Sequence, residues 1–98
     1  MKKSQEQVWG FVREVHDGDT LTLQVTSRSS RNRYPYEVEE RVRLRDVNAP
    51  ELHEAGGRLA KTRLAALEGR RVKCNIHSRD KFGRLICDVV PAPSDYAR

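Results

Sequence analysis

The sequence has no apolar run that approaches the length of a membrane-spanning helix. Hydrophobic residues make up 37% of its 98 residues and charged residues 34%, so we expect one small, polar domain. There is no internal repeat and no linker. Residues 1–3 begin like a signal peptide, but no apolar run follows, so none is expected within this chain. The location stays open, and a secreted form fits if a signal peptide was trimmed.

Cysteine and histidine are also scarce. The three histidines, His16, His53 and His77, have neither the spacing of a zinc site nor that of a catalytic triad. The two cysteines, Cys74 and Cys87, fit no metal spacing and fall on the two arms of a predicted hairpin. Buried, small apolar residues are the favoured interpretation of this pair, and a disulfide remains the alternative.

Acidic residues are too few to balance the basic ones. The net charge is +5, and 14 of the 19 basic residues are arginine. Between Arg58 and Arg84 there are nine Lys or Arg residues against Glu68 and Asp80. A basic half of this kind indicates a polyanionic partner, most simply nucleic acid. A solvated basic face explains the charge equally well.

Hydrophobic periodicity predicts five strands and one helix. The strands are expected at about residues 8–15, 20–26, 37–47, 71–77 and 85–90, and the helix at 58–68. Alternating residues of the strands and one stripe of the helix would form a common core. The expected core consists of Leu21, Leu23, Val25, Leu44, Leu64, Leu67, Val72, Ile76 and Val89.

The segment between the second and third strands, residues 27–36, is rich in Ser, Arg, Asn and Pro and predicts a loop. It contains Arg28, Arg31, Arg33, Tyr34 and Tyr36. Positive charge mixed with aromatic faces suits nucleic acid. Exposed loop residues without a role are an equally good interpretation.

Three short pieces carry the strongest signal. They are DGDT at residues 17–20, RLRDVNAPE at 43–51 and DKFGR at 80–84. Together they supply oxygen ligands for a hard cation, arginines that hold a phosphate in bidentate fashion, and a carboxylate that can take a proton from water. Metal-assisted cleavage of a phosphodiester needs this set of groups.

The order of the three pieces resembles the staphylococcal nuclease (thermonuclease-like) family, which has DGDT, then R-L-x-x-x-D-x-P-E, then D-K-[YF]-G-R. The resemblance covers about residues 8–90. It implies a mainly β fold with one helix, namely a five-stranded OB-type barrel, and calcium-dependent cleavage of DNA and RNA. The whole chain would be one nuclease-like domain, with an ordered core at about 8–90 and polar tails at both ends.

The resemblance also implies a metal site. Asp19 matches the first calcium ligand of the family, and Ala49 matches a residue that binds through its backbone carbonyl. Asn48 stands where most members have a second ligand aspartate, which removes one negative charge and weakens calcium binding. Asp19 and Asn48 also fit simple turn residues, and Asp17 is assigned to the turn.

The remaining positions match catalytic and substrate-binding residues of the family. Glu51 matches the carboxylate that orients or deprotonates the attacking water, and it also suits a helix start. Arg43 and Arg84 match the two phosphate-binding arginines. Lys81 matches a phosphate-contacting lysine, and Phe82 replaces a tyrosine but keeps its ring. Because strand residues alternate, Arg41 and Arg45 lie on the same side of the strand as Arg43. Charge therefore does not choose among the three, and only the alignment with the family motif selects Arg43.

The family normally continues beyond the fifth strand with further helices, so we expect one side of the barrel to lack that cover in these 98 residues. A homodimer is one arrangement that would cover it. Three hypotheses remain: an active nuclease, a nuclease-like barrel that binds single-stranded DNA or RNA without cutting it, and a protein-interaction module on the same fold. The sequence does not decide between DNA and RNA.

Overall fold

The computed structural model describes residues 5–92 as five strands and one helix. In chain order the elements are β1 (Glu6–Asp17), β2 (Thr20–Arg28), β3 (Glu39–Leu44), α1 (Gly57–Ala65), β4 (Arg71–Arg79) and β5 (Leu85–Pro91). The mainly β fold with one helix is therefore confirmed. Residues 1–4 and 93–98, which include most of the predicted tails, lie outside the described part. Within residues 5–92, no helix is long and apolar enough to span a membrane.

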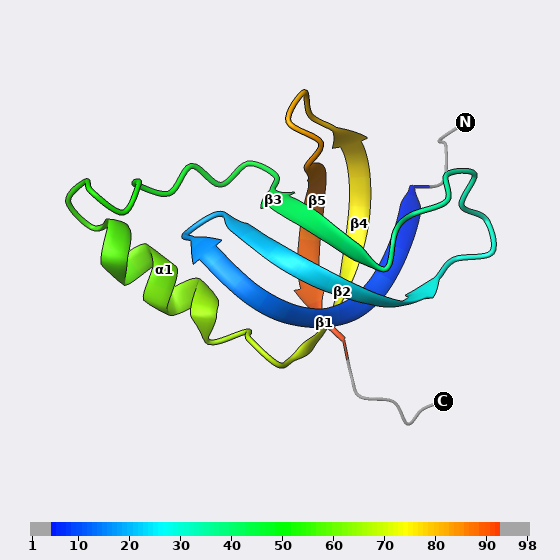
Figure 1. The fold of residues 1–98 in the computed structure, drawn as a ribbon, viewed down its shortest axis with the longest axis horizontal. Coiled ribbons are helices and arrows are strands. Elements are labelled where there is room, and N and C mark those ends of the chain that lie inside the picture. Colours follow the sequence, from blue (N-terminus) through cyan, green and yellow to red (C-terminus); the bar gives the residue numbers. More distant parts are fainter. Residues whose placement is uncertain (1–4, 93–98) are drawn as a thin grey trace.

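The strands form a closed barrel in the order β1-β2-β3-β5-β4, and β4 returns to pair with β1. All neighbours are antiparallel except β3 and β5, which are parallel. Figure 1 shows β1 as a long curved strand, as its three register shifts against β2 require. One shift lies at Gly10, where a Cβ would stand 2.1 Å from the carbonyl oxygen of Gln24. The OB-type barrel is confirmed.

The core follows the predicted alternation. The buried cluster consists of Val8, Val12, Val15, Leu21, Leu23, Val25, Tyr36, Val42, Val72, Cys74, Ile76, Leu85 and Cys87. Leu64, Leu67 and Val89 are partly buried and pack against it. The expected core is thus confirmed for every residue except Leu44.

Leu44 was wrongly placed in the core, because it is not among the partly buried residues that pack against the cluster, and the inward position of β3 belongs to Val42, which is 0% exposed. Both residues have inward parity, but β3 ends at Leu44. Asp46 then adopts a left-handed conformation with φ of 62°, which turns the chain away from the barrel. The strand is also shorter than the predicted 37–47 at its start, where Val38 is 63% exposed.

The helix ends three residues before the predicted Glu68, because β1 binds the following segment. Glu68 Oε2 accepts a hydrogen bond from the Val15 backbone N–H at 2.9 Å. The Gly69 N–H donates to the Val12 carbonyl at 2.7 Å. The segment after α1 therefore lies along β1 and fixes the helix beside the β1–β2 half of the barrel, as Figure 1 shows.

The two cysteines have free thiols and are buried on neighbouring strands, which confirms the favoured interpretation over a disulfide. A hydrogen bond with Cys74, together with burial, raises the pKa of the Cys87 thiol. Both side chains therefore act as small, uncharged residues of the core.

Candidate active site

The DGDT segment forms the β1–β2 turn, and Gly18 packs it against two other parts of the chain. A Cβ at Gly18 would lie 2.5 Å from the Cβ of Ala49 and 2.6 Å from the Cβ of Ala60. The turn, the connection that follows β3, and the helix therefore meet at this point. Only a residue without a side chain allows this approach.

Asp17 stabilises the turn, as predicted, because its Oδ1 accepts a hydrogen bond from the Asp19 N–H at 3.1 Å. Burial acts to raise the pKa of Asp17, but hydrogen bonds from Asp19 and Thr20 outweigh it and the pKa is lowered. The Asp19 carboxylate, in contrast, contacts the segment that follows β3. Its Oδ1 accepts from the Thr20 hydroxyl at 3.0 Å, and its Oδ2 accepts from the Ala49 N–H at 3.1 Å.

Arg43 connects the predicted metal ligands. Its Nη2 donates to Asn48 Oδ1 at 2.8 Å and lies 3.6 Å from Asp19 Oδ2. Its Nη1 donates to the carbonyls of Leu44 and Val47 at 2.8 and 3.0 Å. The guanidinium thus holds the turn after β3 in place. The side chains of Arg43 and Asp19 are 24% and 14% exposed, so this pair is partly shielded from solvent.

The oxygen types of the three predicted ligands are those that a hard divalent cation binds. Asp19 offers a carboxylate, Asn48 an amide oxygen and Ala49 a backbone carbonyl, and calcium takes all three types of ligand. The set carries one formal negative charge. Across residues 5–92, no group of three or more His, Cys, Asp or Glu side chains is arranged to hold a metal. The Arg43 guanidinium places a positive charge next to Asn48 Oδ1 and Asp19 Oδ2.

Arg84 lies on the same outer face of the barrel as Arg43. Arg43 is paired with Ile86 in the parallel β3–β5 ladder, and Arg84 precedes β5 with the same parity as Ile86. Their neighbours Val42 and Leu85 are buried in the core, so the alternation of strand residues is expected to place Arg43, in β3, and Arg84, just before β5, on the outer side of the barrel. Figure 1 shows β3 and β5 side by side at this point.

Asp80 orients Arg84. Its Oδ2 accepts from Arg84 Nε at 2.8 Å, and its Oδ1 accepts from the backbone N–H groups of Arg84 and Phe82 at 2.9 Å. Burial acts to raise the pKa of Asp80, but these hydrogen bonds lower it overall, so the carboxylate stays ionised. In the described part of the chain, the two terminal nitrogens of Arg84 donate no hydrogen bond. They remain available to a phosphate.

Lys81 and Phe82 form the tip of the β4–β5 turn. Phe82 is 71% exposed. The Lys81 Nζ lies 5.4 Å and the Arg84 Cζ 5.2 Å from the centre of its ring. The turn therefore presents an aromatic ring beside two positive charges, as a substrate-binding assignment requires.

Glu51 is the predicted residue that the structure does not bring into the cluster. Its side chain is 73% exposed, and its recorded ionic partner is His53, with 3.8 Å between Oε1 and Nδ1. Its N–H donates to Glu54 Oε1 at 2.8 Å, so it begins a turn that leads to the helix. No contact of Glu51 with Asp19, Arg43 or Arg84 is found in residues 5–92.

The sequence interpretation missed an ion pair inside the barrel mouth. Glu40 is 5% exposed and accepts from Arg79 through both carboxylate oxygens, at 3.1 and 3.3 Å. This hydrogen bond, the largest contribution, raises the pKa of Arg79. A charged residue at an inward position of a strand signals such a partner, because a buried carboxylate needs one.

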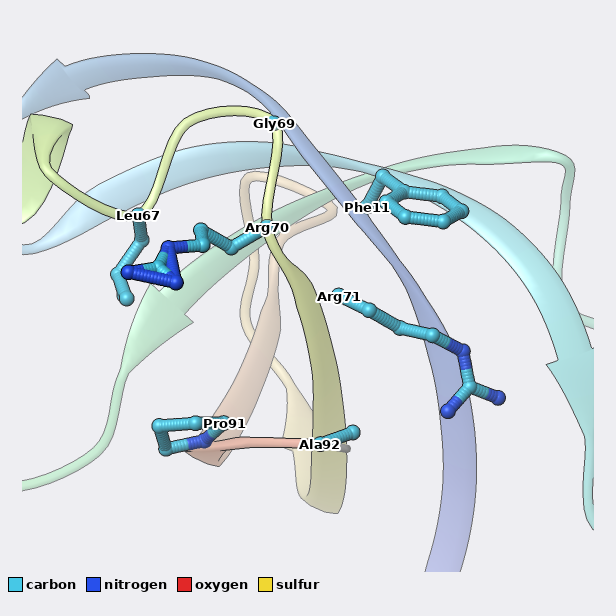
Figure 2. Close-up of a pocket in the computed structure, with 7 residues that line it drawn as sticks. All are labelled: Phe11, Leu67, Gly69, Arg70, Arg71, Pro91 and Ala92. Carbon is cyan, nitrogen blue, oxygen red and sulfur yellow. The ribbon is translucent and has the colours of Figure 1, made fainter. Parts of the chain in front are cut away.

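A separate hollow of about 560 Å³ lies between β1, the segment after the helix and the end of β5. Figure 2 shows its lining residues, which are Phe11, Leu67, Gly69, Arg70, Arg71, Pro91 and Ala92. None of them belongs to the predicted catalytic, metal or substrate-binding set. The hollow is therefore distinct from the candidate active site.

Comparison with known proteins bears on this site. No protein-family model matches the chain. The chain is 36% identical over 88 residues to a micrococcal nuclease of Shigella flexneri, and the aligned region covers 89% of this chain but 44% of that protein. The chain therefore spans less than half the length of the curated relative that it matches. This match confirms the predicted resemblance of the chain to the staphylococcal nuclease (thermonuclease-like) family.

Proposed function

We propose that this chain binds single-stranded DNA or RNA on the face that carries Arg43 and Arg84 and hydrolyses its phosphodiester bonds there. One observation carries the proposal. Arg43 lies against Asp19 and Asn48, and Arg84 directly precedes β5, the strand that pairs with the strand of Arg43, with two terminal nitrogens unused within the described residues. The similarity to a micrococcal nuclease supports the same reaction class.

Arg84 is the residue best prepared to hold the phosphate. Asp80 fixes its Nε, so the two terminal nitrogens form an oriented fork that can donate two parallel hydrogen bonds. Such bonds strengthen as negative charge builds up on the five-coordinate phosphorus. Three of the five N–H donors of Arg43 bond Asn48 Oδ1 and two backbone carbonyls, so a phosphate would use the remaining donors or replace one of these acceptors.

Glu51 supplies the base. Its exposed carboxylate takes a proton from a water molecule, the water oxygen forms a bond to phosphorus, and the bond to the leaving oxygen breaks as that oxygen takes a proton from bulk water. Because Glu51 lies outside the cluster, the connection after β3 must move for this step. Asp19, Asn48 and the Ala49 carbonyl would hold calcium, which supplies positive charge to a phosphoryl oxygen when bound. The single negative charge of this set favours weak binding of the metal.

A chain that binds nucleic acid but cuts it slowly or not at all is the second candidate. Two observations favour it. The guanidinium of Arg43 is already engaged by Asn48 and two backbone carbonyls, and Glu51 lies outside the cluster. The Arg43 bonds leave fewer donors for a phosphate, and Glu51 requires a rearrangement before catalysis.

The test compares Arg84→Ala with Arg45→Ala. Arg45 follows β3 but pairs with Asp46 and Asp88, so it is a matched control for charge. We expect Arg84→Ala to lower the cleavage rate of single-stranded DNA in calcium by about 10²–10³-fold. Arg45→Ala should change it by less than about threefold, since exposed ion pairs contribute little. Wild-type binding without cleavage at any calcium concentration would select the second candidate, and absence of binding would refute both.

A further inference from the structure

The loop between β2 and β3 is fixed to the start of β1. The Asn32 side chain accepts from the Gln7 N–H at 2.9 Å and donates to the Gln7 carbonyl at 2.7 Å. Glu6 accepts from the Arg33 N–H at 2.9 Å and from the Tyr36 hydroxyl at 2.5 Å. Four hydrogen bonds therefore hold the loop in one conformation, so a ligand that binds it pays little ordering entropy.

Tyr34 is the exposed aromatic residue of this loop. Tyr34 is 49% exposed, whereas Tyr36 is 8% exposed and belongs to the core, which corrects its expected place in the loop surface. The two rings are 4.9 Å apart and tilted by 54°. The Arg79 guanidinium lies 5.0 Å from the centre of the Tyr34 ring. The ring is thus held in position while about half of the residue faces solvent.

Arg79 joins Tyr34 to the turn that carries Phe82. Besides its two bonds to Glu40, Arg79 donates to the carbonyl of Gly83 at 2.7 Å. Gly83 follows Phe82 directly, and Phe82 is 71% exposed with Arg84 over its ring. Arg79 therefore links the exposed Tyr34 ring to the turn that carries the exposed Phe82 ring, and a guanidinium lies over each ring.

The charge of this region fits a polyanion. Residues 27–36 contain three arginines and no acidic residue. The segment 79–84 contains three basic residues and Asp80. Glu6 and Glu40 are the acidic residues that contact these two segments from the barrel. Positive charge for phosphates beside aromatic rings for bases is the combination by which proteins bind single strands.

We propose that Tyr34 is a base-stacking subsite for the single strand whose phosphates contact Arg43 and Arg84. The proposal rests on the proposed function for its ligand, but not on cleavage. A base stacks on the open part of the Tyr34 ring, and Phe82 offers a second ring across the β4–β5 turn. Tyr34 therefore extends the binding face from the candidate active site to the loop between β2 and β3.

The experiment measures binding of a fluorescently labelled single strand of about 12 nucleotides in a chelator, where metal-dependent cleavage is prevented. Tyr34→Ala and Tyr34→Leu should raise the Kd about 5- to 20-fold, because both remove the stacking ring. Tyr34→Phe should stay within about twofold of wild type, because it keeps the ring. Val38→Ala is the control, since Val38 is an exposed apolar residue of the same connection.

Salt dependence separates stacking from loss of charge. Tyr34→Leu should leave the slope of log Kd against log salt unchanged, because no phosphate contact is removed. A wild-type Kd in Tyr34→Leu would overturn the proposal, and so would an equal loss in Tyr34→Phe. If Tyr34→Leu binds more weakly than wild type but the wild-type chain never cleaves DNA, the subsite is upheld and the nuclease is refuted. If the wild-type chain cleaves DNA but Tyr34→Leu binds with the wild-type Kd, the nuclease is upheld and the subsite is refuted.

Discussion

Asn48→Asp probes the metal site directly, because it adds one carboxylate at an oxygen that already faces the cluster. Asn48 Oδ1 accepts from Arg43 Nη2 at 2.8 Å, and the same nitrogen lies 3.6 Å from Asp19 Oδ2. The substitution keeps the size of the side chain and an acceptor oxygen at this position. It changes the formal charge of the three-ligand set from −1 to −2.

The magnitude follows from the charge and the exposure of the site. Asn48 is exposed, so a water-like dielectric applies. A unit negative charge and Ca²⁺ at a ligand distance of about 2.4 Å then attract by about 3.5 kcal/mol. The new carboxylate also pairs with Arg43, which must be displaced at a cost of up to about 1 kcal/mol. A gain of about 2.5 kcal/mol remains, equivalent to a roughly 70-fold lower Kd for calcium.

The assay is calorimetric titration of calcium without nucleotide, followed by the cleavage rate of single-stranded DNA against calcium concentration. The double substitution Asp46→Asn with Asn48→Asp is the matched control, because it moves the carboxylate without changing the net charge. Asparagine tolerates the left-handed conformation of Asp46, whose φ is 62°. Both forms should bind calcium more tightly than wild type.

An unchanged calcium Kd in Asn48→Asp would refute the assignment of Asp19, Asn48 and Ala49 as one metal site. Tight calcium binding by the natural chain would show that the missing charge at position 48 does not limit affinity. Tighter calcium in Asn48→Asp without faster cleavage would place the limitation elsewhere, with Glu51 and its connection as the next candidates.

Three further predictions concern the fold and the binding face. Leu21→Ala should cost about 2–5 kcal/mol of unfolding free energy and Leu44→Ala less than about 2, because only Leu21 is fully buried; equal costs in denaturant titration would contradict the corrected core. The Tyr36 hydrogen bond is the main cause that lowers the pKa of Glu6, so the ionised carboxylate stabilises the folded state above the ordinary glutamate pKa. This stabilisation is lost as pH falls through the lowered pKa. An NMR titration should give a higher Glu6 pKa in Tyr36→Phe than in wild type, and equal values would count against this bond. Oligonucleotide affinity should fall steeply with salt, and a flat dependence would exclude phosphate contacts as its source.

The strands and the helix were predictable because their periodicities are strong. Leu21, Leu23 and Val25 alternate without interruption, and all three are buried. The end of β3 was not predictable, since Leu44 has inward parity but is the last residue of the strand, two residues before the left-handed Asp46. Parity determines which face a residue occupies, but it does not show where the barrel opens.

The site was predictable where the motif fixes the backbone. Asp19 and Asn48 both lie next to Arg43, and the Ala49 N–H donates to Asp19, although about 30 residues separate Asp19 from the other two. The position of Glu51 was not, because an exposed side chain on a connection has few contacts to fix it. The roles assigned to these residues remain predictions.

The proposed hydrolysis of phosphodiester bonds is tested most simply by digestion of end-labelled single-stranded DNA with the wild-type chain, in calcium and in a chelator. Glu51→Gln, purified in parallel, controls for a contaminating nuclease. We predict cleavage that rises at millimolar-scale calcium, stops in the chelator and falls by about 10²–10⁴-fold in Glu51→Gln. Intact DNA at every calcium concentration would contradict the proposed nuclease activity. Equal cleavage by wild type and Glu51→Gln would contradict the role of Glu51 as the base.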